Sequence, residues 1–194
     1  MKLCFVRHGE TDWNVDKKIQ GQQDISLNGI GRKQAHELGV KIQQAGFHFA
    51  GIYTSPQLRA KETADILSEL LEIPATVMDG LKELSLGSWE GMSWSQVKEQ
   101  KQDEFSQWDH NRRYAKIPGG ESYQLVLERT LHAIRQIMEQ ENEDVLIVSH
   151  SGVIMTLLSY VYQTDFRDMK RNYGIKNADW VILDSNEIDF IQNR

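Results

Sequence analysis

The sequence of 194 residues contains 22 Lys or Arg and 28 Asp or Glu, which gives a formal net charge of −6 at pH 7. A chain of this length is expected to form one domain, residues 1–194, whose core is stable without disulfides or metals. The acidic balance argues against nucleic acid as a partner, because phosphate backbones are bound chiefly by clustered Lys and Arg. The single cysteine, Cys4, cannot form an internal disulfide. Since there is also no run of ~20 apolar residues and no signal-like start, we expect a cytoplasmic protein without a membrane partner.

The first apolar run, Leu3–Val6, does not alternate with polar residues, which is typical of a strand buried on both faces in a parallel sheet. Arg7 and His8 follow at the carboxyl end of this strand, where open α/β sheets bind their ligands. Gly9 would allow a sharp turn that brings backbone N–H groups to the same place. A lone histidine after a strand is more often structural than catalytic, so this stretch indicates only a candidate site.

Strand and helix patterns alternate along the rest of the chain. Strand patterns occur at residues 3–6, 51–54, 76–78, 144–149, 180–183 and 187–191, while helix patterns follow the capping residues Asn28 and Ser122, include Arg59 in a first turn, and cover 153–161. The last two strands would form a hairpin joined at Ser185 and Asn186. This alternation predicts an α/β fold, a three-layer α/β/α sandwich with a mostly parallel central sheet and an antiparallel edge. The irregular segment around 80–121 is expected to be an insertion that covers the sheet edge and the substrate.

A second buried strand, 144–149, ends directly before His150, so two strands would bring a histidine to the same sheet edge. The motifs are Arg7-His8-Gly9-Glu10-Thr11 followed by Asn14, Ser55-Pro56 followed by Arg59, and His150. With these motifs the chain resembles the histidine phosphatase superfamily, also called phosphoglycerate mutase-like. The resemblance covers essentially the whole chain and implies the phosphoglycerate mutase-like fold.

The residue types at this edge suit phosphoryl transfer. Neutral imidazole is a good nucleophile, so His8 can attack phosphorus and form a phosphohistidine, provided that its other ring nitrogen donates to a backbone carbonyl. Arg7 and Arg59 offer planar forks that match phosphate oxygens, and a protonated His150 would add a third donor. The sequence shows no cluster of metal ligands, and we expect that neither a metal nor another cofactor is required.

The leaving alcohol needs a proton, and a water must then be activated, so one carboxyl group should serve as acid and then as base. From the residues alone, Glu83, Glu90 and Asp79 cannot be ranked for this role. The resemblance implies Glu83, because the acid of the family lies in a segment like Leu81–Leu84 that is followed by Gly-x-Trp-Glu-Gly.

The resemblance also implies residues that bind substrate. They are Asn14, Thr11, Gln20, Gly21 and Ser151, of which the last would contribute its backbone N–H. Arg112 and Arg113 are loosely similar to the segment with which mutases hold a substrate carboxylate, and they are equally compatible with a solvated run of charge.

The segment after Glu83 is similar to the phosphatase branch of the family, which implies a metal-independent phosphomonoesterase that acts on a small phosphorylated metabolite. A bisphosphoglycerate-dependent phosphoglycerate mutase or a sugar bisphosphatase is the alternative. A phosphate-binding module without activity is disfavoured, because a binder needs neither a nucleophile nor an acid. Sugar phosphates, phosphoserine, a cobalamin precursor and phosphoglycerates all stay open as substrates, and a homodimer is one oligomeric state compatible with the sequence.

Overall fold

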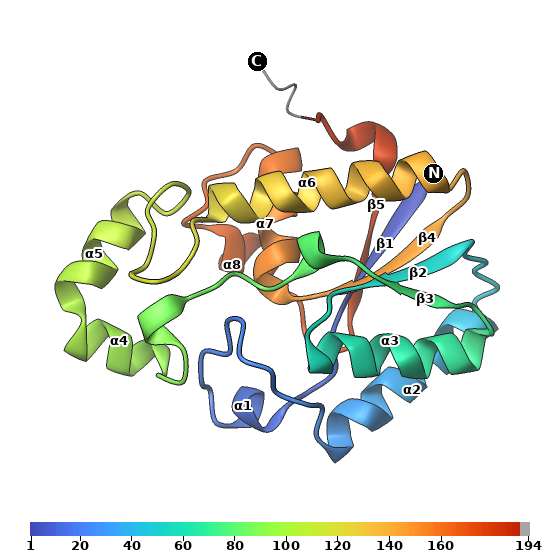
Figure 1. Cartoon of the computed structure of the whole chain (residues 1–194), viewed down its shortest axis with the longest axis horizontal. Coiled ribbons are helices and arrows are strands. Elements are labelled where there is room, and N and C mark those ends of the chain that lie inside the picture. Colours follow the sequence, from blue (N-terminus) through green and yellow to red (C-terminus); the bar gives the residue numbers. More distant parts are fainter. Residues whose placement is uncertain (191–194) are drawn as a thin grey trace.

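The central sheet forms the middle layer of the molecule, and helices cover both of its faces (Figure 1). The computed structural model describes residues 1–190. The strands are β1 (Lys2–Arg7), β2 (Gly51–Thr54), β3 (Ala75–Val77), β4 (Val145–Ser149) and β5 (Trp180–Asp184). The helices are α1 (Asp12–Val15), α2 (Gly29–Gln44), α3 (Leu58–Leu71), α4 (Trp94–Gln100), α5 (Gln102–His110), α6 (Tyr123–Gln140), α7 (Ser151–Val161) and α8 (Met169–Tyr173). The predicted three-layer α/β fold is therefore confirmed.

The strands follow the order β3-β2-β4-β1-β5, and all neighbouring pairs are parallel except β1 and β5. β1 lies between β4 and β5, so its backbone groups are paired on both sides. In the register of β1 and β4, Arg7 lies opposite Ser149. The residues that follow these two strands, His8 and His150, are thereby brought to neighbouring positions at the carboxyl edge.

Side chains of β1 alternate between two hydrophobic layers, as the pleat of a strand requires. Cys4 and Val6 pack in one layer with side chains of α2 and α3, whereas Leu3 and Phe5 pack in the other with side chains of α6 and α7. All four are completely buried, which explains the unbroken apolar run in the sequence.

The predicted hairpin at the end of the chain is wrong. Residues 185–187 form a 3₁₀ turn, 188–190 are not in a strand, and residue 191 lies outside the described residues. The reason is a capping box, in which the Asp184 side chain accepts from the Asn186 N–H and the Glu187 carboxylate accepts from the Asp184 N–H. This pair of hydrogen bonds turns the chain out of the sheet. The antiparallel edge exists nevertheless, because β5 pairs directly with β1.

The segment 80–121 is more regular than expected, since it contains α4 and α5. These helices contribute to a separate apolar cluster in which Trp89 and Trp108 are fully buried, with their ring centroids 5.3 Å apart. Figure 1 shows α4 and α5 to one side of the sheet layer, reached from β3 by an extended connection. The aromatic residues thus pack this segment against side chains of α6, α7 and α8.

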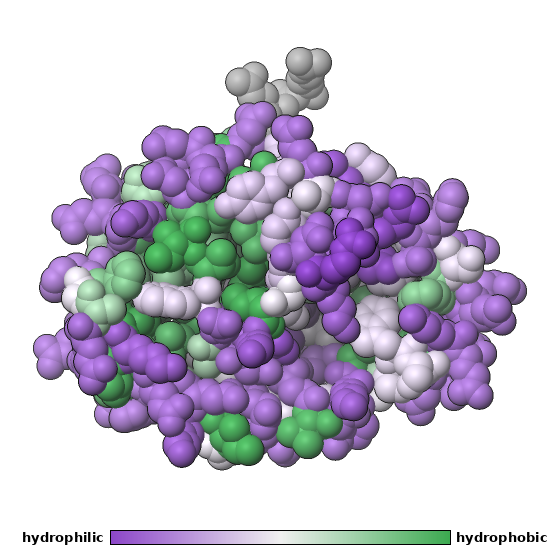
Figure 2. Space-filling view, turned by 180° about the vertical axis from the view of Figure 1, so that it is seen from behind, coloured by the Kyte–Doolittle hydropathy of each residue, from purple (hydrophilic) through white to green (hydrophobic). Residues whose placement is uncertain are grey.

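The surface seen from behind is mostly hydrophilic, with a limited apolar area (Figure 2). Within residues 1–190, none of the helices has both the length and the apolar character that crossing a membrane requires.

Candidate active site

The rings of His8 and His150 lie at the carboxyl edge of the sheet with their centroids 5.2 Å apart. Both side chains are buried. Gly9 does not adopt a positive φ. Its missing side chain is required instead because the Gly31 backbone of α2 occupies the position that a Cβ would take. The Gly9 N–H donates to Thr63 Oγ1 at 3.0 Å, so α2 and α3 both press against the turn that carries His8.

The His8 ring is oriented by its own turn, since Nδ1 lies 2.7 Å from the carbonyl oxygen of Gly9. A carbonyl can only accept, so Nδ1 carries the proton and Nε2 keeps its lone pair. Burial, with Arg59 and Arg7 nearby, holds the pKa of His8 well below its ordinary value. The imidazole is therefore neutral, as a nucleophile must be.

The environment of His150 differs from the expectation that it is protonated. Burial first, and then the charge of Arg59, hold the pKa of His150 well below its ordinary value. Its Nε2 lies 2.8 Å from the Ser55 hydroxyl, while its buried Nδ1 has no hydrogen-bond partner among residues 1–190. In this structure His150 is thus a neutral group, and a bound anion would be needed to favour its charged form.

Arg7 and Arg59 are largely buried and line the same cavity as His8. Arg7 donates to the Ile175 carbonyl at 2.8 Å, and Arg59 donates to the carbonyls of Gln23 and Gly21. Burial lowers the pKa of Arg59 to about 10, partly offset by the charge of Glu83. In both arginines Nε has no partner among the described residues. Two buried guanidinium groups beside a neutral imidazole form a site for an anion.

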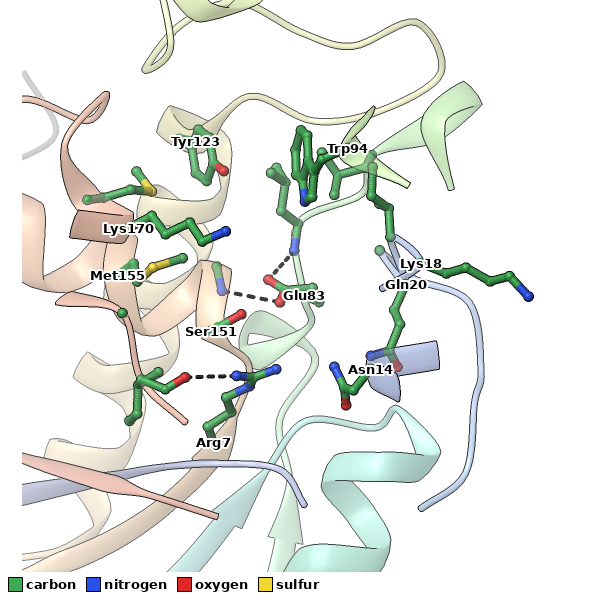
Figure 3. A pocket seen from close by; sticks show the side chains of 18 of the residues that line it. Arg7, Asn14, Lys18, Gln20, Glu83, Trp94, Tyr123, Ser151, Met155 and Lys170 are labelled. Atoms are coloured by element: carbon green, nitrogen blue, oxygen red, sulfur yellow. Dashed lines mark hydrogen bonds between the residues drawn. The ribbon is translucent and has the colours of Figure 1, made fainter. Parts of the chain in front are cut away.

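Glu83 is the single acidic residue that lines this cavity within the described part of the chain. Its carboxylate accepts hydrogen bonds from the N–H groups of Leu84 at 2.9 Å and Gly152 at 3.2 Å (Figure 3). A side chain at position 152 would collide with this carboxylate, which explains the glycine there. The structure thereby separates the candidates that the sequence left equal. Glu90 is bound to the loop 20–23 through Gln22 and Gln23 and lies outside the cavity lining.

Asn14 lines the cavity, but Thr11 does not. The Thr11 side chain is instead used to cap α1, where it accepts from the Asn14 N–H. In this structure Thr11 is buried and its side chain caps α1, and the contact of Thr11 with substrate stays a prediction. The Asn14 Oδ1 accepts from the Thr11 N–H and from Asn177 Nδ2 at 3.2 Å. These two bonds leave the Asn14 amide nitrogen free to point into the cavity (Figure 3).

Neither Asn177 nor Gln57 could be predicted as a site residue, because each acts through contacts with residues far away in the sequence. Asn177 also donates to the carbonyls of His8 and Gly9. The Gln57 side chain accepts from the Glu83 N–H at 2.7 Å and donates to the Gly21 carbonyl at 3.0 Å. Gln57 therefore joins the segment of the candidate acid to the loop that also binds Arg59.

The remaining predicted residues divide between the cavity and the surface. Gln20, Gly21, Ser151 and Arg112 line the cavity, which has a volume of about 480 Å³. Arg113 does not line it. Its guanidinium bonds to Gln124 instead and lies 5.1 Å from the Phe166 ring centroid. Of the two arginines, only Arg112 lines this cavity. Within residues 1–190 no group of three or more His, Cys, Asp or Glu side chains is arranged to hold a metal ion.

Comparison with known proteins agrees with this geometry. The sequence profile of the histidine phosphatase superfamily (branch 1) matches residues 3–191. The chain belongs to this superfamily. Its relatives include the uncharacterized phosphatase PhoE of Bacillus subtilis, which is 36% identical over 82% of this chain and 76% of the relative. The metal-independent phosphoserine phosphatase of Arabidopsis thaliana is 30% identical over 93% of this chain and 79% of the relative.

Solved structures show the same fold. A mycobacterial glucosyl-3-phosphoglycerate phosphatase in complex with VO3 superposes with a TM-score of 0.83 at 29% identity, covering 94% of this chain and 92% of that one.

Among the sequence relatives, proteins from Salmonella that are named probable phosphoglycerate mutase also match, at 30% identity over 93% of this chain and 85% of theirs. The relatives are thus phosphatases and phosphoglycerate mutase-like proteins.

Proposed function

We propose that the protein is a metal-independent phosphomonoesterase that works through a phosphohistidine on His8. The observation that carries this proposal is the state of His8, which is buried, neutral and oriented by the Gly9 carbonyl beside the fully buried Arg59 and the partly buried Arg7. A binding protein needs the arginines but not an unprotonated imidazole nitrogen facing the anion site. The names of the relatives, which include a metal-independent phosphatase, support the same reading.

In the first step, Nε2 of His8 attacks phosphorus in line with the leaving oxygen, and the bond between phosphorus and that oxygen breaks. Arg7, Arg59 and the Asn14 amide donate to the three equatorial oxygens, where the negative charge resides. Glu83, in its protonated form, gives its proton to the leaving alkoxide.

In the second step, the Glu83 carboxylate takes a proton from a water molecule, and the resulting hydroxide attacks the phosphohistidine. The P–N bond breaks, the electron pair returns to Nε2, and inorganic phosphate leaves. A mutase would pass the phosphoryl group to a second organic hydroxyl instead. The relatives named as mutases keep that alternative in view, whereas the position of Arg113 outside the cavity removes part of the argument for it.

The test is the His8→Ala variant, assayed for phosphate release from 4-nitrophenyl phosphate in the presence of EDTA. We expect turnover by the unaltered protein under these conditions, and a loss of more than about ten-thousand-fold in the variant, because a nucleophile has no substitute in the site. The matched control is His36→Ala, which removes an exposed histidine of α2 and should leave the rate unchanged.

Rapid acid-free quenching with labelled substrate should also trap a phosphorylated protein that is stable in base and labile in acid, as phosphohistidine is. Near-normal activity of His8→Ala, or a phosphate label on another residue, would contradict the mechanism. A primer-dependent conversion of phosphoglycerates that exceeds phosphate release would establish the mutase instead.

A further inference from the structure

The cavity is basic, although the chain as a whole is acidic. Among residues 1–190 its lining contains six basic side chains and one acidic side chain, Glu83. Arg7 and Arg59 lie at the end occupied by His8, where the proposed function places the phosphoryl group. The other four basic residues are Lys18, Lys98, Arg112 and Lys170. Two arginines suffice to match one phosphate dianion, so the proposed function leaves this second group of cations unexplained.

Two members of the second group are neutralised by neighbours. Lys18 forms an ion pair with Asp16 at 3.0 Å. Arg112 forms an ion pair with Asp109, and its guanidinium stacks on the Trp108 ring at 3.8 Å from the centroid. Arg112 is therefore held in the cavity wall by its own contacts.

Lys98 and Lys170 have no acidic partner in the part of the chain that the structure describes. Lys98 belongs to α4, and its ammonium group lies 5.2 Å from the Phe105 ring centroid. Lys170 belongs to α8 and extends into the cavity on the side of Glu83 that is away from Arg7 (Figure 3). Unpaired cations on two different elements that line one cavity favour an anion between them.

The surface between the phosphate end and these lysines is apolar. Leu84, Trp94 and Met155 line it, and Figure 3 shows Trp94 and Met155 on opposite sides of the space next to Glu83. A volume of about 480 Å³ is also larger than a phosphate group requires and lies in the range of small-molecule sites.

We infer that the substrate is a phosphomonoester whose alcohol part carries a second anionic group, which Lys170 and Lys98 bind while an apolar portion lies against Leu84 and Met155. The inference rests on the proposed function, because that function places the phosphoryl group at His8. The second anionic group is a carboxylate or a phosphate, and both share the chemistry that an ammonium group recognises.

The experiment uses aryl phosphates that differ only at the far end of the ring. The probes are 4-carboxyphenyl phosphate, its neutral isostere 4-carbamoylphenyl phosphate, and 4-(phosphonomethyl)phenyl phosphate. Dissociation constants are measured by calorimetry with the His8→Ala protein, which does not consume the probes, and kcat and KM are measured with His8 in place. We expect each charged probe to bind about tenfold more tightly than the neutral one, as a charge-assisted hydrogen bond supplies. Whichever charged probe has the larger ratio identifies the second anion as carboxylate or phosphate.

Variants of the two lysines show which side chain binds the second anionic group. Lys170→Met should reduce the ratio of charged to neutral binding to within about threefold, Lys98→Met should reduce it in part, and Lys170→Arg should keep it. Both methionine variants should raise KM for the charged probe more than KM for the neutral probe. The matched control is Lys33→Met, which removes a charge from the surface of α2, where Lys33 pairs with Glu37.

Equal binding of charged and neutral probes, or a ratio unaffected by both lysine substitutions, would overturn the inference. Failure of the proposed function gives a different result. Absence of hydrolysis of all three probes would refute the phosphatase assignment, while the binding ratios would still decide whether the second anion site exists.

Discussion

His8 and His150 lie at the same sheet edge but differ in their hydrogen-bond partners. The Gly9 carbonyl fixes the proton of His8 on Nδ1, so its Nε2 is available at any pH at which the ring is neutral. His150 has no such carbonyl partner and contacts the Ser55 hydroxyl instead. The two histidines therefore differ in their hydrogen bonding, while both are buried.

The lowered pKa values of the two histidines predict how stability depends on pH. Above pH 6.5 both rings are neutral in the folded and in the unfolded chain. Below pH 6.5 the unfolded chain takes up protons that the folded chain does not, because burial holds the folded pKa of each histidine well below 6.5. The free energy of unfolding should therefore decrease as the pH falls from 7.5 to 5.5, by about 1.4 kcal/mol per pH unit for each histidine below 6.5.

Urea unfolding followed by tryptophan fluorescence measures this dependence. In His150→Asn the loss of stability across this pH range should be about half as steep. The same steepness in the variant and in the unaltered protein would show that His150 takes up a proton in the folded state.

Glu83→Gln tests the second residue of the proposed mechanism. The amide cannot give a proton to the leaving group, so alkyl phosphates such as glycerol 3-phosphate should be hydrolysed about 10² to 10⁴ times more slowly. For 4-nitrophenyl phosphate, whose leaving group needs no proton, phosphorylation of His8 should remain fast and appear as a burst of nitrophenol. Equal losses in the first step for both substrates would assign the proton to another group.

At the scale of elements, the residue that precedes α3 joins two loops of the site through hydrogen bonds. Gln57 lies at the cap position before α3 and is buried, and its amide binds the Glu83 N–H and the Gly21 carbonyl at once. Arg129 of α6 fixes the same segment from the other side, since it donates to the carbonyls of Lys82 and Glu83. Glu83 is thus positioned by two helices from opposite layers of the fold.

Gln57→Leu keeps the volume of the side chain and removes the hydrogen bonds of its amide, including those with the Glu83 N–H and the Gly21 carbonyl. We expect kcat for glycerol 3-phosphate to fall by about ten- to a hundredfold, because the carboxyl group of Glu83 is displaced, whereas KM changes less. The burst with 4-nitrophenyl phosphate should be preserved. Gln43→Leu, at the far end of α2, is the control. An equal effect on both substrates would reveal general damage to the site and no specific positioning of Glu83.

The sequence allowed β1, β4 and the first turn of α3 to be predicted, because each combines a local apolar pattern with a polar residue at its end. The roles of Asn177 and Gln57 have no such local signal. Asn177 meets Asn14 across 163 positions of sequence, and only the fold creates that contact. The predicted closing hairpin is wrong for a local reason, since Asp184 and Glu187 form a capping box where the sequence pattern indicates a turn between two strands.

At the scale of the whole molecule, an oxyanion that binds in the cavity should stabilise the folded chain. Arg7 and Arg59 line the cavity, and the buried Nε of each has no partner among residues 1–190. An oxyanion that binds these groups only in the folded state must stabilise the whole domain. Vanadate at about one hundred times its dissociation constant should add about 2.7 kcal/mol to the free energy of unfolding.

Thermal unfolding with and without vanadate measures this stabilisation, and a domain of this size should gain about 5–10 °C in Tm. Arg59→Met serves as the control. Whatever its own Tm, this variant should show a much smaller shift on addition of vanadate. A shift of the same size would mean that the ion binds elsewhere.

The place of β1 in the sheet also bears on how the protein reaches its native state. β1 comes early in the sequence, yet its two neighbours in the sheet are β4 and β5, which follow it by more than a hundred residues. Strands that are so far apart in the sequence pair slowly, because the chain between them must first lose conformational entropy. We therefore expect the strand that ends in Arg7 to stay without its pairing partners during the first stages of folding. Because β1 pairs with two strands so distant in the sequence, we expect completion of the site to be a late event in folding, and an apolar strand to lack its partners until then.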